Sequence, residues 1–345
     1  MNKLIDKLRT AGSLSKSEFE ELINCDKNTA EELRQTAEKL RIESYGHDIY
    51  IRGLIEFTNF CKQDCLYCGI RKSNLNCQRY RLSEDDIMEC CREGYRLGFR
   101  TFVLQGGEDA FFNDDRLCSI IEKIKGEYPD CALTLSVGEK PYQSYKRFYD
   151  CGADRYLLRH ETANAEHFAK LHPKSQTLES RKECLLALKE IGYQVGCGFM
   201  VGSPYQTVGT LAEDLLFIKE LNPQMVGIGP FIHHNDTPFR DFPDGTLELT
   251  LKLLSIIRVM LPKVLLPATT ALATIDPIGR EKGILAGANV VMPNLSPVSV
   301  RKKYQLYENK VCTGEESAQC KGCLEARIRS VGCRIAVNRG DSMNI

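Results

Sequence analysis

The stretch IRGLIEFTNFCKQDCLYCGI, residues 51–70, joins an apolar run to a cluster of cysteines. Its first part, IRGLIEF, is mostly apolar, and a short run of this kind bounded by polar residues predicts a buried strand. The cysteines Cys61, Cys65 and Cys68 follow at the spacing C-x3-C-x2-C, and Tyr67 precedes the last of them. The stretch therefore predicts a strand that ends in a loop with three thiols.

Similar runs recur along the chain, and amphipathic helical patterns separate them. The further strands are predicted at residues 101–105, 132–137, 154–161, 194–201, 225–231, 263–269 and 289–293. Strands that alternate with helices in this way indicate a parallel (β/α)8 barrel of the TIM type. A doubly wound open sheet is the alternative, but it would place a glycine-rich phosphate-binding turn where the cysteines stand.

The chain divides into three parts around this barrel. Residues 1–48 predict a helical extension, in which Ser15 and Glu18 have the spacing of a capping box. Residues 49–306 hold the barrel, and residues 307–345 form a short cysteine-rich segment packed on it. Because active sites of such barrels lie at the C-terminal ends of the strands, the three thiols fall on the expected catalytic face.

Charge and composition limit the kind of partner and compartment. The chain has 46 basic and 46 acidic residues, so its net charge favours neither a nucleic acid nor an anionic membrane. The N-terminal segment has no continuous apolar run, so we expect neither a signal peptide nor a membrane span. We therefore expect a cytoplasmic location. In that reducing compartment, scattered cysteines among the 16 behave as small buried residues, and clustered ones bind metal or react.

Three thiols so close together suit a metal site with one open position. Thiolates bind zinc and iron–sulfur clusters, but a structural zinc site or an ordinary electron-transfer cluster would use four ligands. Three ligands on a [4Fe-4S] cluster leave one iron free to chelate the amino and carboxylate groups of S-adenosylmethionine (SAM). Cys77, nine residues after Cys68, is the alternative fourth ligand that would close the site.

Several motifs resemble one family. The C-x3-C-x2-C spacing with an aromatic residue before the last cysteine is the signature of the radical SAM superfamily. The wider stretch FTNFCKQDCLYCGIRKSNLNCQRYRLS resembles the HydE family of [FeFe]-hydrogenase maturases, as do LQGGED, LTLSVGE, DRYLLRHETAN and the tail pattern C-x7-C-x2-C. The resemblance covers about residues 45 to 335. Biotin synthase and methylornithine synthase are similar in general pattern, but the tail cysteines argue against the latter.

The resemblance implies a [4Fe-4S] cluster on Cys61, Cys65 and Cys68, with SAM beside it. A Gly-Gly-Glu motif contacts the methionyl amino group in such families, a glutamate holds the ribose, and an arginine pairs with the methionyl carboxylate. For Arg181, a solvated helix face is the plain alternative. The residues expected to bind SAM are Tyr67, Gly106, Gly107, Glu108, Ser136, Glu161 and Arg181.

The segment DRYLLRHE, residues 154–161, carries several charges in a predicted strand. Alternation places Arg155, Arg159 and Glu161 on one face, where charges are costly unless they are paired or bind a ligand. An internal salt bridge between Arg159 and Glu161 is the structural alternative. Thr134 and Ser136 share a face of their own strand, and both can donate hydrogen bonds to a ligand.

The resemblance also implies a substrate and partners. The substrate would be a small iron complex carrying cysteine, CO and cyanide, supplied by the maturase HydG, and the product would go on toward HydF. A reduced flavodoxin or ferredoxin would donate electrons, and no nucleic acid or membrane partner is expected. Arg155 and Arg159 are expected to lie below SAM. The residues expected to contact the substrate are Arg52, Thr134, Ser136, Arg155, Arg159, Met225, Thr269, Thr270, Met292 and Tyr304.

The tail cysteines and the overall activity leave alternatives open. Cys312, Cys320 and Cys323 can hold a second cluster, [2Fe-2S] or [4Fe-4S], to which Cys333 could add a fourth ligand, and zinc is the alternative metal. A biotin synthase-like or aminomutase-type radical SAM enzyme acting on a small amino acid is the enzymatic alternative. A non-catalytic iron–sulfur carrier is the other, and a carrier needs no SAM site.

Overall fold

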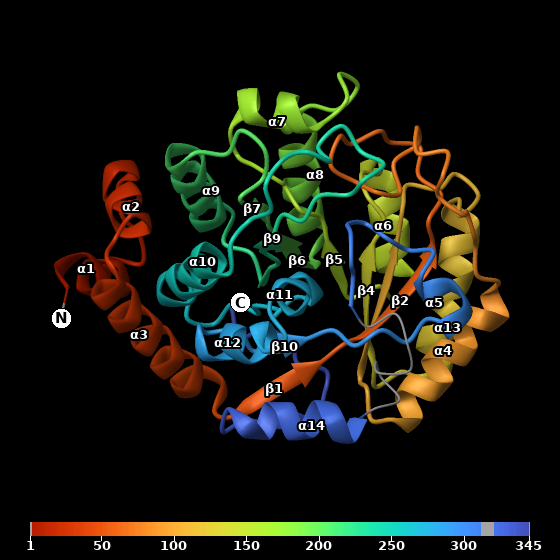
Figure 1. Ribbon diagram of the computed structural model, residues 1–345. Coiled ribbons are helices and arrows are strands. Elements are labelled where there is room, and N and C mark those ends of the chain that lie inside the picture. The colour runs from red at the N-terminus through yellow and green to blue at the C-terminus, as the bar shows by residue number, and fades with distance from the viewer. Residues whose placement is uncertain (1, 312–320, 345) are drawn as a thin grey trace.

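A ring of parallel strands forms the centre of the computed structural model, which describes residues 2–311 and 321–344 (Figure 1). The continuous part of the ring has the order β2-β3-β4-β5-β6-β8, and all its pairs are parallel. These strands are β2 (Gly53–Thr58), β3 (Thr101–Gly106), β4 (Ala132–Ser136), β5 (Arg155–Leu157), β6 (Gln194–Cys197) and β8 (Met225–Val226).

Isolated bridges close the ring. Met225 pairs with Leu265, Pro267 with Val290, and Leu54 with Asn294, all in parallel. The seventh predicted strand, residues 263–269, is thus present in position but makes only single bridges, because Pro267 has no backbone N–H to donate to a ladder. The predicted barrel is confirmed, and residues of β10 (Val290–Val291) occupy its last position.

Two predicted strands are interrupted near the rim of the barrel. The segment 194–201 divides into β6 and β7 (Met200–Val201), and the segment 225–231 divides into β8 and β9 (Gly229–Pro230). Gly198 has φ +152°, and a Cβ at this position would overlap the carbonyl oxygen of Gly227. The two interruptions therefore lie against each other, and only glycine permits this close approach.

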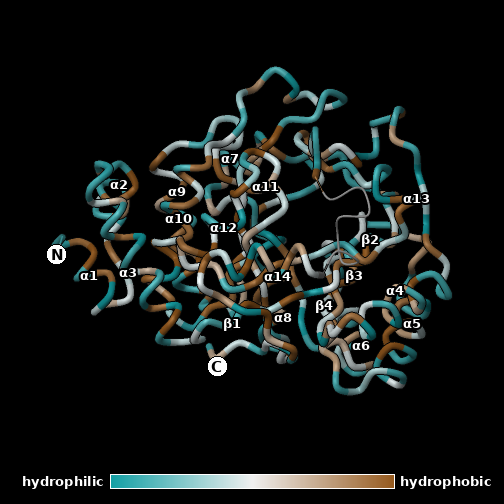
Figure 2. The backbone as a smooth tube through the Cα atoms, turned by 60° about the horizontal axis from the view of Figure 1, so that its bottom comes forward, coloured by the Kyte–Doolittle hydropathy of each residue, from teal (hydrophilic) through white to brown (hydrophobic). Residues whose placement is uncertain are grey.

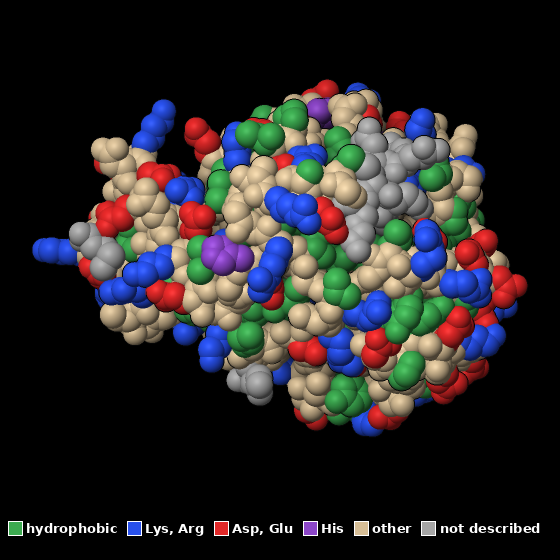
Figure 3. Space-filling view, turned by 90° about the horizontal axis from the view of Figure 1, so that it is seen from below, with side chains coloured by type: hydrophobic (Ala, Val, Ile, Leu, Met, Phe, Trp, Pro, Cys, Tyr) green, Lys and Arg blue, Asp and Glu red, His purple; other side chains and the backbone are tan. Residues whose placement is uncertain are grey.

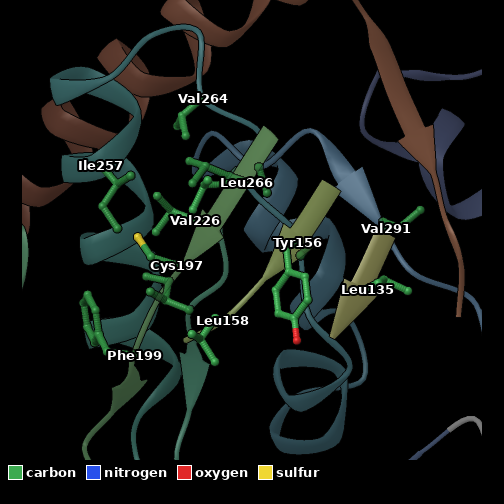
Figure 4. Packing of buried hydrophobic residues seen from close by; sticks show 14 of the residues in the cluster. Leu135, Tyr156, Leu158, Cys197, Phe199, Val226, Ile257, Val264, Leu266 and Val291 are labelled. Carbon is green, nitrogen blue, oxygen red and sulfur yellow. The ribbon is translucent and has the colours of Figure 1, made fainter. Parts of the chain in front are cut away.

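Helices surround the ring and bury its outward-facing side chains. They are α4 (Glu84–Arg96), α5 (Asp114–Glu127), α6 (Tyr142–Asp150), α7 (Ala165–Leu171), α8 (Leu178–Ile191), α9 (Val208–Leu221), α10 (Leu247–Met260), α11 (Thr270–Ile275), α12 (Gly279–Leu285) and α13 (Val298–Arg301). Figure 4 shows the packing, in which Cys197 and Val226 of the strands face Ile257 of α10. Outer loops are mostly hydrophilic (Figure 2). This layer of apolar contacts fixes the strands from outside.

The N-terminal extension consists of α1 (Lys3–Ala11), α2 (Lys16–Ile23) and α3 (Lys27–Tyr45). The predicted capping box is confirmed, since the Ser15 side chain accepts from Glu18 N–H and the Glu18 carboxylate accepts from Ser15 N–H. Helix α2 packs on α9, and α3 packs on α10 (Figure 1). The extension therefore packs against one side of the barrel, away from the cysteine loop.

Residues 321–344 cover the end of the barrel opposite to the strand tips. Strand β1 (Asp48–Ile51) lies between β10 and β11 (Arg334–Ala336), and α14 (Lys321–Ser330) precedes β11 (Figure 1). Seen from below, acidic and basic side chains are interspersed over this face (Figure 3). In the parts of the chain that the structure describes, no helix combines the length and apolar character that crossing a bilayer requires.

Arg155 ties this segment to the barrel. Its side chain is fully buried, and its guanidinium donates to Gln194 Oε1, Thr101 Oγ1, the Arg339 carbonyl and Asp341 Oδ1, the last at 2.7 Å. All three nitrogens of the guanidinium are thus used. Arg155 is therefore an anchor for residues 339–341 at the N-terminal end of the strands.

We predict that Asp341→Ala lowers the free energy of unfolding by about 2–3 kcal/mol, because it leaves a buried guanidinium without its counter-charge. The matched control is Arg334→Ala, which breaks the exposed pair between Arg334 and Asp48 and should cost about 0–1 kcal/mol. Urea unfolding followed by circular dichroism measures both values. Equal losses in the two variants would mean that Arg155 does not depend on Asp341.

Candidate active site

Three thiols meet in one cavity at the C-terminal ends of the strands. Cys61, Cys65 and Cys68 follow β2 and line a cavity of about 350 Å³. Cys61 Sγ accepts a hydrogen bond from Glu108 N–H at 3.4 Å, and the Cys65 thiol donates to Gln176 Oε1 at 3.4 Å. This placement agrees with the sequence prediction, which puts the triplet at the mouth of the barrel.

The loop that carries the thiols is held by its own charged residues. Asp64 accepts two hydrogen bonds from Arg71, at 2.7 and 2.6 Å, and two more from Ser73. The guanidinium of Arg79 donates to the carbonyls of Asn59, Ile70, Arg71 and Asn74. These bonds hold the loop in place where it forms no strand or helix of its own.

Burial affects the acidity of all three thiols. It raises the pKa of Cys61, raises that of Cys65 to about 12, and raises that of Cys68 well above its usual value. Repulsion between neighbouring thiolates adds to the effect at Cys65 and Cys68. Burial therefore disfavours the thiolate forms, and a bound metal centre would supply the positive charge that favours them.

The donor set fits a cluster better than one metal ion. Within residues 2–311 and 321–344, no three His, Cys, Asp or Glu side chains stand close enough to hold a single ion. A cubane cluster binds each cysteine at a separate iron, so its ligands need not converge on one point. Cys77 does not line this cavity. It lies in a separate depression with His234 and Asp236, and Asn59 donates to its sulfur.

The glycines of the stretch LQGGED allow the next strand to approach the thiol loop. A Cβ on Gly107 would overlap the carbonyl oxygen of Phe60, and one on Gly106 would press on Thr58. The carboxylate of Glu108 accepts from Gln63 at 2.9 Å and lies 3.3 Å from Lys62 Nζ. Gly106, Gly107 and Glu108 all line the cavity, as the prediction for a SAM site requires.

Glu161 has a strained backbone beside the cavity. Its φ is +65°, a left-handed value that costs about 1–2 kcal/mol for a residue with a side chain. The strain is held by Glu161 N–H, which donates to the Gly198 carbonyl, and by Ala163 N–H, which donates to Asp214 Oδ1 at 2.5 Å. Burial raises the pKa of Asp214 well above its usual value. The predicted strand 154–161 therefore bends after β5.

Arg159 and Glu161 form the salt bridge that the sequence left as an alternative. Arg159 Nη2 is 3.0 Å from Glu161 Oε2, but the alignment is not that of a hydrogen bond. Among the described residues, Arg159 Nε and Nη2 and Glu161 Oε2 have no hydrogen-bond partner. Both side chains line the cavity, so each keeps hydrogen-bonding capacity for a ligand.

Arg181 is buried against the cavity rather than solvated on its helix. Its Nε donates to Glu139 Oε1 at 2.5 Å, and its Nη1 donates to the Arg159 carbonyl at 2.6 Å. Ser180 also donates to Glu139. Sequence reasoning missed Glu139, although it stands two residues after the predicted strand 132–137, and residues after strand ends are the ones that face a barrel's active site.

The residues expected to contact the substrate fall into two groups. Ser136, Arg159, Thr269, Thr270 and Tyr304 line the cavity, together with the predicted SAM residues Tyr67, Glu161 and Arg181. Arg52, Thr134, Met225 and Met292 do not line it. Met225 and Met292 belong to an apolar layer deeper in the barrel, where Arg52 Nη1 is 2.9 Å from Met225 Sδ.

Arg155 requires a correction. The sequence placed it on the ligand face of its strand, below SAM, but its guanidinium holds residues 339 and 341 at the far end of the barrel. The alternation of side chains was right, since Arg155 does point inward. The partner that satisfies its charge comes from the other end of the chain, and no local pattern reveals such a contact.

The tail cysteines lie partly outside the described residues. Cys312 and Cys320 fall in the segment 312–320, which the structure does not describe, and Cys323 lies on α14. Cys333 is buried beyond the end of α14, and its thiol donates to the Val331 carbonyl. The Cys333 N–H donates to the Ile328 carbonyl, so the chain turns back against the end of α14 before it reaches Cys333. The suggestion that Cys333 adds a fourth ligand to the tail cysteines stays a prediction.

Comparison with known proteins finds relatives of this chain both by sequence and by fold. The radical SAM superfamily model matches residues 55–218. The [FeFe] hydrogenase maturase subunit HydE of Thermotoga maritima is 45% identical over 89% of this chain and 87% of its own length. A 3-methylornithine synthase of Methanosarcina acetivorans is 28% identical over 84% and 82%. The crystal structure of methylornithine synthase (PylB) superposes with a TM-score of 0.85, at 25% identity, over 97% of both chains.

We expect the purified chain to bind about four iron atoms at the triplet after anaerobic reconstitution with iron and sulfide. The measurement uses a parent in which Cys312, Cys320 and Cys323 are already alanine, so that tail iron does not contribute. In this parent, Cys61→Ala, Cys65→Ala or Cys68→Ala should each lose most of the iron and the charge-transfer absorbance, because a ligand is missing. Cys77→Ala should keep both. Loss of the cluster in Cys77→Ala would mean that the site is closed by four cysteines.

Proposed function

Because the chain belongs to the HydE family of radical SAM enzymes, we propose that it cleaves SAM reductively and acts on a small iron complex that carries cysteine, CO and cyanide. Its place in [FeFe]-hydrogenase maturation follows from the family. The observation that carries the proposal is the cavity itself. Three thiols share it with the carboxylates of Glu108 and Glu161 and the guanidinium of Arg181.

We assign the charged groups of the cavity to the parts of SAM. Glu108 is suited to the methionyl ammonium, and Arg181 to the methionyl carboxylate, because a guanidinium fork matches a carboxylate. Glu161 is an acceptor for the ribose diol. When bound, a [4Fe-4S] cluster on the three thiols supplies one electron for cleavage of the S–C5′ bond of SAM. The protein residues then act by holding SAM in one orientation and by excluding water.

Buried hydrogen-bond donors in the deeper part of the barrel favour an anionic substrate. Buried donors without a hydrogen-bond partner in the described part of the chain point to a ligand that brings lone pairs or negative charge. They include Arg52 Nε and Nη2, Thr134 Oγ1 and Thr269 Oγ1, in addition to Arg159. A cyanide-bearing complex with a cysteine carboxylate has acceptors of this kind. Arg52 and Thr134 would reach it only from beneath the cavity lining.

The remaining assignments extend the same proposal. The complex would come from HydG, the product would go to HydF, and a reduced flavodoxin or ferredoxin would supply electrons. A second cluster on the tail cysteines is proposed as dispensable for SAM cleavage. The reducing cytoplasm remains the expected location, since it keeps cluster thiols available. An aminomutase-type reaction on a small amino acid is the second candidate, because a 3-methylornithine synthase and a methylornithine synthase structure are similar over most of the chain.

We predict that the reconstituted, reduced protein converts SAM to 5′-deoxyadenosine and methionine, and that Cys61→Ala abolishes this reaction. Anaerobic incubation followed by chromatography measures the product, with Cys77→Ala as the matched thiol control that should remain active. Addition of the HydG product should be followed by its consumption. Addition of candidate amino acids tests the second candidate. A protein that holds its cluster but never cleaves SAM would be an iron–sulfur carrier, and the proposed function would be wrong.

Gly138→Ala should weaken SAM binding by roughly ten- to a hundredfold, the loss of one hydrogen bond to a charged group. Gly138 has φ +77°, and a Cβ there would overlap the Glu108 side chain, so the carboxylate must move. Gly126→Ala on α5 is the matched control, because no atom lies within 4 Å of the added Cβ. Calorimetric titration of SAM into both reconstituted variants gives the two affinities. Similar affinities would exclude Glu108 as a SAM ligand.

A further inference from the structure

A histidine outside the cavity lining holds the phenol of Tyr67. Tyr67 Oη is 3.2 Å from His172 Nε2, and His172 Nδ1 is 3.1 Å from the Phe168 carbonyl oxygen. A carbonyl only accepts, so Nδ1 carries the proton of the ring. Burial lowers the pKa of His172 to about 3, which keeps the imidazole neutral and leaves Nε2 as an acceptor. Tyr67 therefore donates its hydroxyl proton to His172.

The end of α7 also binds the backbone of the thiol loop, at the residue before Tyr67. Leu66 N–H donates to the Leu171 carbonyl at 2.9 Å, one residue before His172. The loop is thus held by its backbone at Leu66 and by its side chain at Tyr67, in the short interval between Cys65 and Cys68. The end of α7 is therefore the external support of the part of the loop that faces the cavity.

Aromatic packing fixes His172 in turn. Its ring stacks on Phe168 with centroids 3.9 Å apart and planes at 17°, while Tyr67 meets it edge-on at 5.5 Å. Arg181 Cζ lies 5.8 Å from the centroid of the Phe168 ring. With its ring packed and both nitrogens in hydrogen bonds, His172 has one orientation in which it can serve as an acceptor.

We propose that His172 is a positioning residue for SAM binding, which acts by fixing the Tyr67 ring where the bound nucleoside meets it. The inference rests on the proposed function. Tyr67 lines the cavity between two cluster cysteines, and its aromatic face can contact a nucleoside only while the ring is held in place. Without this acceptor, the phenol is left to its other neighbour, the Cys65 thiol, and His172 no longer fixes the ring.

The test is a double-mutant cycle on SAM affinity, measured by calorimetric titration of the reconstituted protein without reductant. His172→Phe keeps an aromatic ring against Phe168 and removes the acceptor, and Tyr67→Phe removes the donor. Each should weaken SAM binding about three- to tenfold, and the double variant should be no weaker than either single one. His172→Gln should recover most of the affinity, because its amide oxygen can stand near the position of Nε2.

Three outcomes would overturn the proposal. They are unchanged affinity in Tyr67→Phe, losses that simply add in the double variant, and failure of His172→Gln to rescue binding. If His172→Phe folds poorly, the affinity of Tyr67→Phe alone still tests the first outcome. Additivity can then be measured in a second cycle that combines Tyr67→Phe with His172→Gln. Failure of the proposed function looks different, because the parent protein itself would then not bind SAM.

Discussion

Parallel strand pairing around a closed ring is the constraint on which the site depends. Since every strand of the barrel runs the same way, each carboxyl end reaches the same rim. Residues that follow β2, β3, β5 and β9 therefore line one cavity, although more than a hundred and fifty residues separate the first from the last. The single bridges at Leu265, Pro267 and Asn294 complete the ring with few backbone hydrogen bonds. Packing of the outer helices must therefore supply the stability that these hydrogen bonds do not give.

The rim also has to hold charges that are partly removed from water. Each is placed beside an opposite charge: Arg181 with Glu139, Glu108 with Lys62, and Arg159 with Glu161. A buried pair of this kind adds little net stability, because desolvation offsets most of the attraction. What the pairing provides is a set of groups already oriented before a ligand arrives, at a modest cost in folding free energy.

Sequence patterns could predict the elements whose signal is local. Apolar runs located the barrel strands, cysteine spacing located the three thiols of the cavity, and Ser15 with Glu18 marked the start of α2. Patterns could not predict contacts made at long range. The inward face of β5 was recognised, but the partner of Arg155 lies almost two hundred residues away, at Asp341. Glu139 and His172 were missed because their roles come from neighbours on other elements, Arg181 and Tyr67.

The anchor between Arg155 and residues 339–341 has a consequence for the order of biosynthesis. Residues 53–108 contain β2, β3 and the whole thiol loop, and they leave the ribosome early. The guanidinium of Arg155 is made soon afterwards, yet its counter-charge emerges about 190 residues later, and β1 must also wait for β11. At the several residues per second of translation, the base of the barrel stays open for roughly ten seconds or more. The complete thiol loop has therefore been synthesised well before the N-terminal end of the barrel can close.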